Sequence, residues 1–101
     1  MRLTEDQRNA LKAAARQSFE PGAVVRLFGS RLDDHRQGGD IDLLIETQMT
    51  DPAHIVRAHT QFLSHVYSSL GEQKIDVVID YPNRQTHSPI YAHARETGVP
   101  L

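Results

Sequence analysis

Carboxylates inside strand-like apolar runs are the feature that most constrains this fold. Asp40 and Asp42 open the run Ile41-Asp42-Leu43-Leu44-Ile45, and Asp76 lies within Ile75-Asp76-Val77-Val78-Ile79. Burying a charged group is costly unless something compensates it. Successive side chains of a strand point to opposite faces, so Asp40 and Asp42 share one face, about 7 Å apart. On the later run Ile75, Val77 and Ile79 share one face and Asp76 lies on the other, so the three acids form one cluster if the strands are neighbours.

A Gly-Ser turn precedes these acids. Leu27-Phe28-Gly29-Ser30 reads as the end of a strand followed by a sharp turn and the start of a helix. Gly29 allows the backbone to approach a ligand closely. Helix N-termini bind phosphate through their free N–H groups, so Gly29 and Ser30 are candidate phosphate ligands. If Asp76 lies beside Asp42, the three acids could bind two divalent ions about 3.5–4 Å apart, as in phosphoryl-transfer sites. Mg²⁺ prefers such oxygen ligands and substrate phosphates.

Other local signals predict the remaining elements. Thr4-Glu5-Asp6-Gln7 resembles a capping box and opens a helix that runs to about Phe19. A second helix follows Asp51-Pro52 and ends near Leu70, before Gly71, and a short third helix runs from Ser88-Pro89 to Gly98. Strands are predicted over 23–28, 41–46 and 74–80. The pattern predicts one α+β (α/β) domain over residues 1–101, a small mixed sheet covered by helices on one face.

Composition excludes several classes of protein. The chain has 101 residues and no cysteine, so disulfides and thiolate metal sites are ruled out. Its net charge of −2 argues against nonspecific nucleic-acid binding. It contains no apolar run of membrane-spanning length and no signal-peptide pattern, so we expect a cytoplasmic protein without a membrane partner.

The combination of Gly29-Ser30, Asp40-x-Asp42 and a later Asp76 resembles the DNA polymerase β-like nucleotidyltransferases, in particular the minimal nucleotidyltransferases (MNT) of prokaryotic two-gene modules. The resemblance implies that fold and a magnesium-dependent enzyme, with Mn²⁺ as an alternative metal. It implies catalytic and metal-binding roles for Asp40, Asp42 and Asp76, and nucleotide binding by Gly29 and Ser30.

Many members follow Gly-Ser with a small residue and Arg-Gly, whereas this chain has Arg31-Leu32-Asp33-Asp34. Either Arg31 or Arg36 then replaces the arginine that contacts phosphate in the family, or the chain lacks an equivalent.

The resemblance also implies partners. It implies ATP or another nucleoside triphosphate as donor and a helical HEPN-type toxin or substrate-binding subunit as partner, the chain being an antitoxin that adenylylates a tyrosine. The alternative is a module that neutralises or complements such a subunit by docking alone. We expect the helix around Tyr91 to be a candidate docking surface. A receiver domain with an acidic pocket fits less well, because the chain is short for five βα units.

Overall fold

The computed structural model describes residues 2–32, 39–84 and 87–101. In chain order its elements are α1 (Glu5–Ser18), β1 (Val24–Phe28), the 3-10 helix η1 (Gly29–Leu32), β2 (Ile41–Glu46), α2 (Pro52–Leu70), β3 (Ile75–Asp80), α3 (Pro89–Thr97) and β4 (Val99–Pro100). The predicted order of helices and strands is confirmed. The two-residue β4 is an addition, and η1 lies where the sequence predicts the start of a helix.

The helix ends follow the predicted signals. Thr4 and Gln7 form the capping box of α1, each side chain bonding the other's backbone N–H. The Asp51 side chain accepts a hydrogen bond from the Ala53 N–H and so caps α2. Gly71 ends α2 with a positive φ of 79°, a conformation that costs little only for glycine.

The sheet is mixed and has the order β3-β2-β1-β4. Strand β1 pairs antiparallel with β2 and with β4, whereas β2 and β3 run parallel. The parallel pair is joined by the long helix α2, since parallel neighbours need a crossover connection. This parallel pairing brings the two acid-bearing strands side by side.

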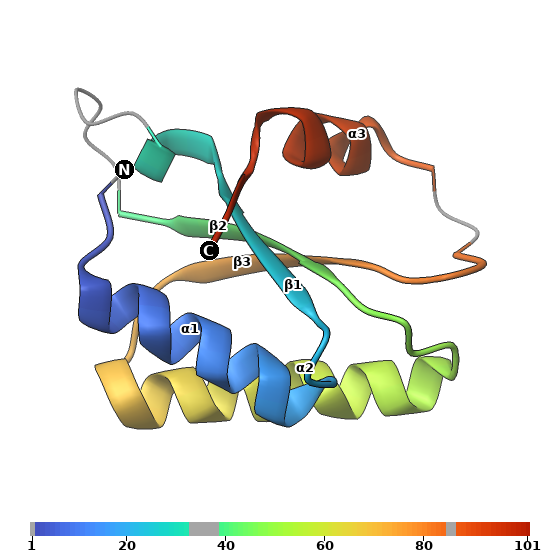
Figure 1. Cartoon of the computed structure of the whole chain (residues 1–101), viewed down its shortest axis with the longest axis horizontal. Coiled ribbons are helices and arrows are strands. Elements are labelled where there is room, and N and C mark those ends of the chain that lie inside the picture. The colour runs from blue at the N-terminus through green and yellow to red at the C-terminus, as the bar shows by residue number, and fades with distance from the viewer. Residues whose placement is uncertain (1, 33–38, 85–86) are drawn as a thin grey trace.

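Helices cover both faces of the sheet, so the predicted one-sided cover is wrong. Figure 1 shows α1 and α2 together below the sheet and α3 above it. The lower layer contains the main core, where these side chains are completely buried: Leu11, Leu27, Ile41, Leu43, Ile45, Phe62 and Val66. A smaller cluster lies under α3 and consists of Phe28, Leu44 and Ala94, with Leu32, Val78 and Tyr91 at its margin. The apolar residues Phe28, Leu44 and Val78 lie on the face of the sheet that also carries the acids, and α3 packs against them there.

Candidate functional site

The parallel register aligns the predicted acids across two strands. Asp42 of β2 lies directly opposite Asp76 of β3, one residue beyond the pair of Ile41 and Ile75. Asp40 immediately precedes β2 and, by the alternation of side chains, shares the face of Asp42. Asp76 is exposed, and Asp42 is partly buried. The sequence therefore placed all three carboxylates correctly on one face of neighbouring strands.

Gly29 packs directly against Asp42. Its φ is 79°, and strand β1 delivers it there because Phe28 is the register partner of Asp42. A Cβ added at Gly29 would overlap the Asp42 Oδ2 atom and lie 3.1 Å from Cγ. Glycine is therefore required here for two reasons, the backbone conformation and the space that the carboxylate occupies. The turn and the acids, which lie far apart in the sequence, form one continuous site.

The site disfavours negative charge when no cation is bound. Burial raises the pKa of Asp42, and the charges of Asp76 and Asp40 raise it further. A hydrogen bond between the Asp42 and Asp76 side chains acts in the same direction, because it stabilises the protonated Asp42 carboxyl as donor. Lys74 offers partial compensation, since its Nζ lies 3.9 Å from the Asp40 Oδ1.

Arg31, predicted to contact phosphate, is engaged within the protein. Its guanidinium donates hydrogen bonds to the carbonyl oxygens of Arg2, at 2.8 Å, and Gly39, at 3.0 Å. The Arg2 N–H in turn donates to the Arg31 carbonyl at 2.7 Å. Arg31 thus joins the first residues of the chain to the segment that leads into Asp40. The other candidate, Arg36, and the side chain of Ser30 lie outside the described residues.

The predicted helix start at Gly29 and Ser30 is a single 3-10 turn of four residues. A single turn is too short for a helix dipole to build up, so any phosphate binding there would depend on the free N–H groups of the turn itself rather than on a helix N-terminus.

The opposite end of the same face carries an ionic latch, formed by Asp80, Arg84 and Arg95. Asp80 ends β3, and Arg84 donates to its Oδ1 at 2.8 Å while Arg95 of α3 donates to its Oδ2. Burial acts to raise the pKa of Asp80, but the hydrogen bonds and positive charges of both arginines outweigh it and lower the pKa. The Arg84 guanidinium also lies 3.6 Å from the centre of the Tyr91 ring.

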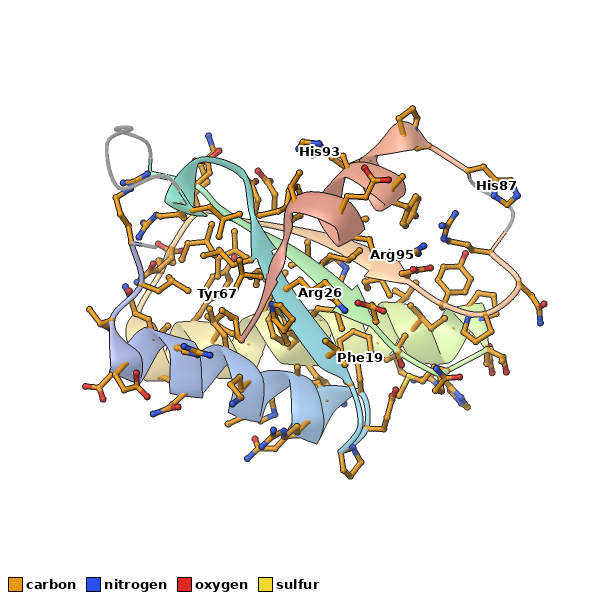
Figure 2. The ribbon with its side chains drawn as sticks, turned by 45° about the horizontal axis from the view of Figure 1, so that its top comes forward. Phe19, Arg26, Tyr67, His87, His93 and Arg95 are labelled. Carbon is orange, nitrogen blue, oxygen red and sulfur yellow. The ribbon has the colours of Figure 1, made fainter. Side chains whose placement is uncertain are left out.

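The latch fastens α3 to the strand that carries Asp76. Figure 2 places Arg95 and His93 on this helix, above the sheet. Tyr91 is half-buried beneath Arg84, so its ring helps to hold α3 in place. Sequence reasoning missed Lys74 and Arg95. Lys74 could have been found, because it lies two residues before Asp76, on the same face, whereas the partner of Arg95 depends on the position of α3.

The donor atoms present fit Mg²⁺. Carboxylate oxygens from neighbouring strands are the hard ligands that Mg²⁺ prefers. As they stand in the described residues, His, Cys, Asp and Glu side chains form no group of three or more that could hold a metal ion. Asp40, Asp42 and Asp76 would therefore adjust their side chains on binding, while the strands fix their backbones.

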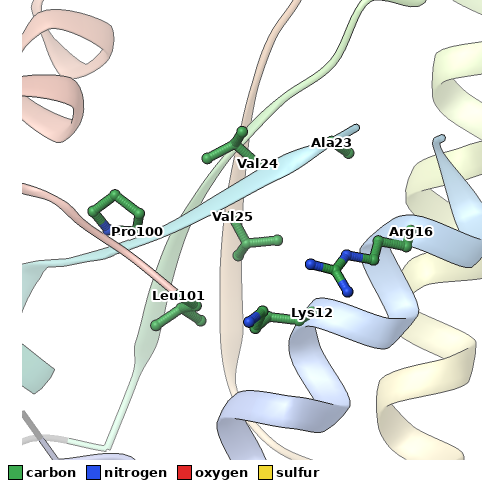
Figure 3. A pocket seen from close by; sticks show the side chains of 7 residues that line it. All are labelled: Lys12, Arg16, Ala23, Val24, Val25, Pro100 and Leu101. Atoms are coloured by element: carbon green, nitrogen blue, oxygen red, sulfur yellow. The ribbon is translucent and has the colours of Figure 1, made fainter. Parts of the chain in front are cut away.

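A separate hollow of about 180 Å³ lies between α1 and the β1–β4 edge of the sheet. Lys12 and Arg16 extend into it from α1, toward Val25 and Leu101 (Figure 3). Its lining contains no carboxylate side chain, so it is unrelated to the acid cluster.

In the described part of the chain, none of the helices combines the length and apolar character that crossing a membrane requires. No protein-family model matches the chain, and no curated protein matches it.

Proposed function

We propose that this chain is a metal-dependent nucleotidyltransferase, which transfers AMP from ATP to a hydroxyl group on a separate helical protein. One observation carries the proposal. Asp42 and Asp76 are register partners on neighbouring parallel strands, and Gly29 packs against Asp42 from the preceding turn. This juxtaposition joins a close-approach turn to a cluster of hard oxygen ligands, the two parts that a nucleoside triphosphate with its cations requires.

The acids would have different roles toward the nucleotide donor and the hydroxyl acceptor. Asp40 and Asp42 would hold the metal ions, and Asp76 would complete the set. Bound Mg²⁺ would supply charge neutralisation for the phosphates and acidify the acceptor hydroxyl. The acceptor oxygen forms a bond to the α-phosphorus, the bond from that phosphorus to the bridging oxygen breaks, and pyrophosphate leaves. Asp76 accepts the hydroxyl proton, a role suited to a carboxylate on the exposed side of the site.

The acceptor is proposed to be a tyrosine on a HEPN-type toxin, which would make the chain an antitoxin. The identity of nucleotide and acceptor rests on the family resemblance of the motif. The occupancy of the sheet supports a separate acceptor, because the turn, the acids and α3 lie on the same face within the described residues. Localisation in a prokaryotic cytoplasm belongs to the same proposal.

Mass spectrometry tests the activity directly. The purified chain is incubated with ATP, Mg²⁺ and the protein encoded by the neighbouring gene, and both proteins are weighed. The expected result is a gain of one AMP on the neighbour, lost with Asp42→Asn and with EDTA. Binding of ATP that is equal with and without EDTA would contradict the two-metal site.

A docking module is the second candidate. It is favoured by the internal use of Arg31, whose guanidinium donates to the carbonyl oxygens of Arg2 and Gly39. A stable complex with the neighbouring protein and no change of mass would support docking without transfer.

A further inference from the structure

Lys74 belongs to the same row of side chains as the acids. Asp42 pairs with Asp76 and Ile41 with Ile75, so the preceding residues, Asp40 and Lys74, also lie opposite one another. The Ile41 N–H donates to the Lys74 carbonyl at 3.0 Å, which extends the parallel ladder to this position. By the alternation of strand side chains, Lys74 shares the face of Asp76. The register thus places an ammonium group beside the carboxylates.

The contact between Lys74 and Asp40 is loose. The Nζ–Oδ1 distance of 3.9 Å exceeds hydrogen-bond length, and 78% of the Lys74 side chain is exposed. Exposed ion pairs of this kind add little to folding stability. The ammonium group is therefore free to exchange Asp40 for another anion without disturbing the strands.

A polyphosphate in this site needs a cation that is available. Arg31 is occupied by two backbone carbonyls and holds the chain around the turn. Lys74 has the opposite character, a compact charge on a flexible stem, at the edge of the acid cluster. Cations bound by the acids would also compete with Lys74 for Asp40 and release it.

We infer that Lys74 contacts the polyphosphate of the bound nucleotide, leaving Asp40 when the acids bind metal ions. The inference rests on the proposed function. It assigns to Lys74, the residue that precedes β3, the contact for which the resemblance made Arg31 or Arg36 the candidate.

Lysine footprinting tests this in the unmodified protein, because the chain has only two lysines, Lys12 and Lys74. Lys12 lies in the hollow between α1 and the sheet edge, apart from the acids (Figure 3), and serves as an internal control. The protein is acylated briefly with an N-hydroxysuccinimide acetate, with Mg²⁺ alone or with Mg²⁺ and a non-hydrolysable ATP analogue, and both peptides are quantified. The analogue should protect Lys74 and leave the labelling of Lys12 unchanged.

Variants give a second measurement. Lys74→Met should weaken binding of the Mg²⁺-bound analogue about tenfold or more, as expected for loss of a charged hydrogen bond. Lys74→Arg should restore most of the affinity, and Lys12→Met should have no effect. Circular dichroism of each variant shows whether it is folded.

The outcomes separate the inference from the proposed function. Metal-dependent binding of the analogue with equal labelling of Lys74 in its presence and absence overturns the inference and leaves the proposed function intact. Failure of the analogue to bind at any Mg²⁺ concentration overturns both.

Discussion

Gly29 and Gly71 offer a matched pair for testing how the turn and the acids are coupled. Both have a φ of 79°, so alanine at either position is strained by its backbone. They differ in their surroundings: a Cβ at Gly71 would meet nothing within 4 Å, whereas a Cβ at Gly29 would overlap the carboxylate of Asp42. The difference between Gly29→Ala and Gly71→Ala therefore isolates the contact with Asp42.

The magnitudes follow from these two terms. Backbone strain should cost each variant about 1–3 kcal/mol of unfolding free energy. The overlap should add about 1–3 kcal/mol to Gly29→Ala, unless the Asp42 side chain rotates away from the turn. Each kcal/mol lowers the Tm of a domain of this size by about 4–8 °C. Asp42→Ala removes the overlapping atoms and leaves its Cβ 3.3 Å away, a contact that needs only a small shift, so Gly29→Ala in that background should cost little beyond the strain.

Two assays cover both responses of Asp42. Urea unfolding of the two single variants and the double variant measures the coupling energy. An NMR titration of the Asp42 carboxyl reports its position, because its pKa is raised by burial and by Asp76 and Asp40. Rotation out of the site should return that pKa toward the ordinary value of 3.8 in Gly29→Ala and leave it raised in Gly71→Ala. A coupling energy below about 0.5 kcal/mol together with an unchanged pKa would refute the reasoning.

Three further predictions address charge and packing. Asp42→Asn should leave the metal-free unfolding free energy at pH 7 equal or slightly higher. The folded state binds the Asp42 proton more tightly than the unfolded state does, so the stability of the wild-type protein should also fall as pH rises from about 4 through the raised pKa. Urea unfolding in EDTA should show that this pH-dependent loss of stability is missing from the variant. Asp80→Asn should cost about 1–2 kcal/mol at pH 7 and speed amide exchange in α3, while Glu96→Gln in the same helix should do neither. The stabilisation that the ionic latch gives the wild-type protein should disappear as pH falls through the lowered pKa of Asp80. If amide exchange in α3 stayed slow in Asp80→Asn, packing alone would hold this helix. Phe62→Ala should lower the unfolding free energy measured with urea by about 3–5 kcal/mol, because the ring of Phe62 is completely buried. Val56→Ala, at a side chain that is 65% exposed, should change it by less than about 0.5 kcal/mol. Equal losses in the two variants would refute the assignment of the core.

Local signals in the sequence were sufficient for most of the fold. The capping box at Thr4, the Asp51 cap and Gly71 each act within a few residues, so their effects can be predicted without knowing the tertiary structure. The alternation around Asp42 and Asp76 likewise fixes which face each acid occupies.

Features that depend on long-range contacts could not be predicted in this way. Helix α3 packs on the face of the sheet opposite α1 and α2, because Phe28 and Leu44 form an apolar surface there. No local sequence pattern predicts which face of a sheet a helix will cover. The engagement of Arg31 depends on the carbonyl of Arg2, twenty-nine residues away. The overlap between Gly29 and Asp42 is visible only once the register of β1 and β2 is known.

The position of β3 at the margin of the sheet has a consequence for how the site should be disabled in experiments. Its outer backbone groups have no strand partner in the described part of the chain, so the strand is a template for pairing between molecules. Asp76 is the charge that interrupts its apolar sequence. Asp76→Ala would create an uncharged segment from Ile75 to Ile79 on that margin, with the properties of an aggregation-prone strand. Loss of solubility in that variant could then be mistaken for loss of activity, and Asp76→Asn, which keeps a polar side chain, is the better choice for an inactive protein.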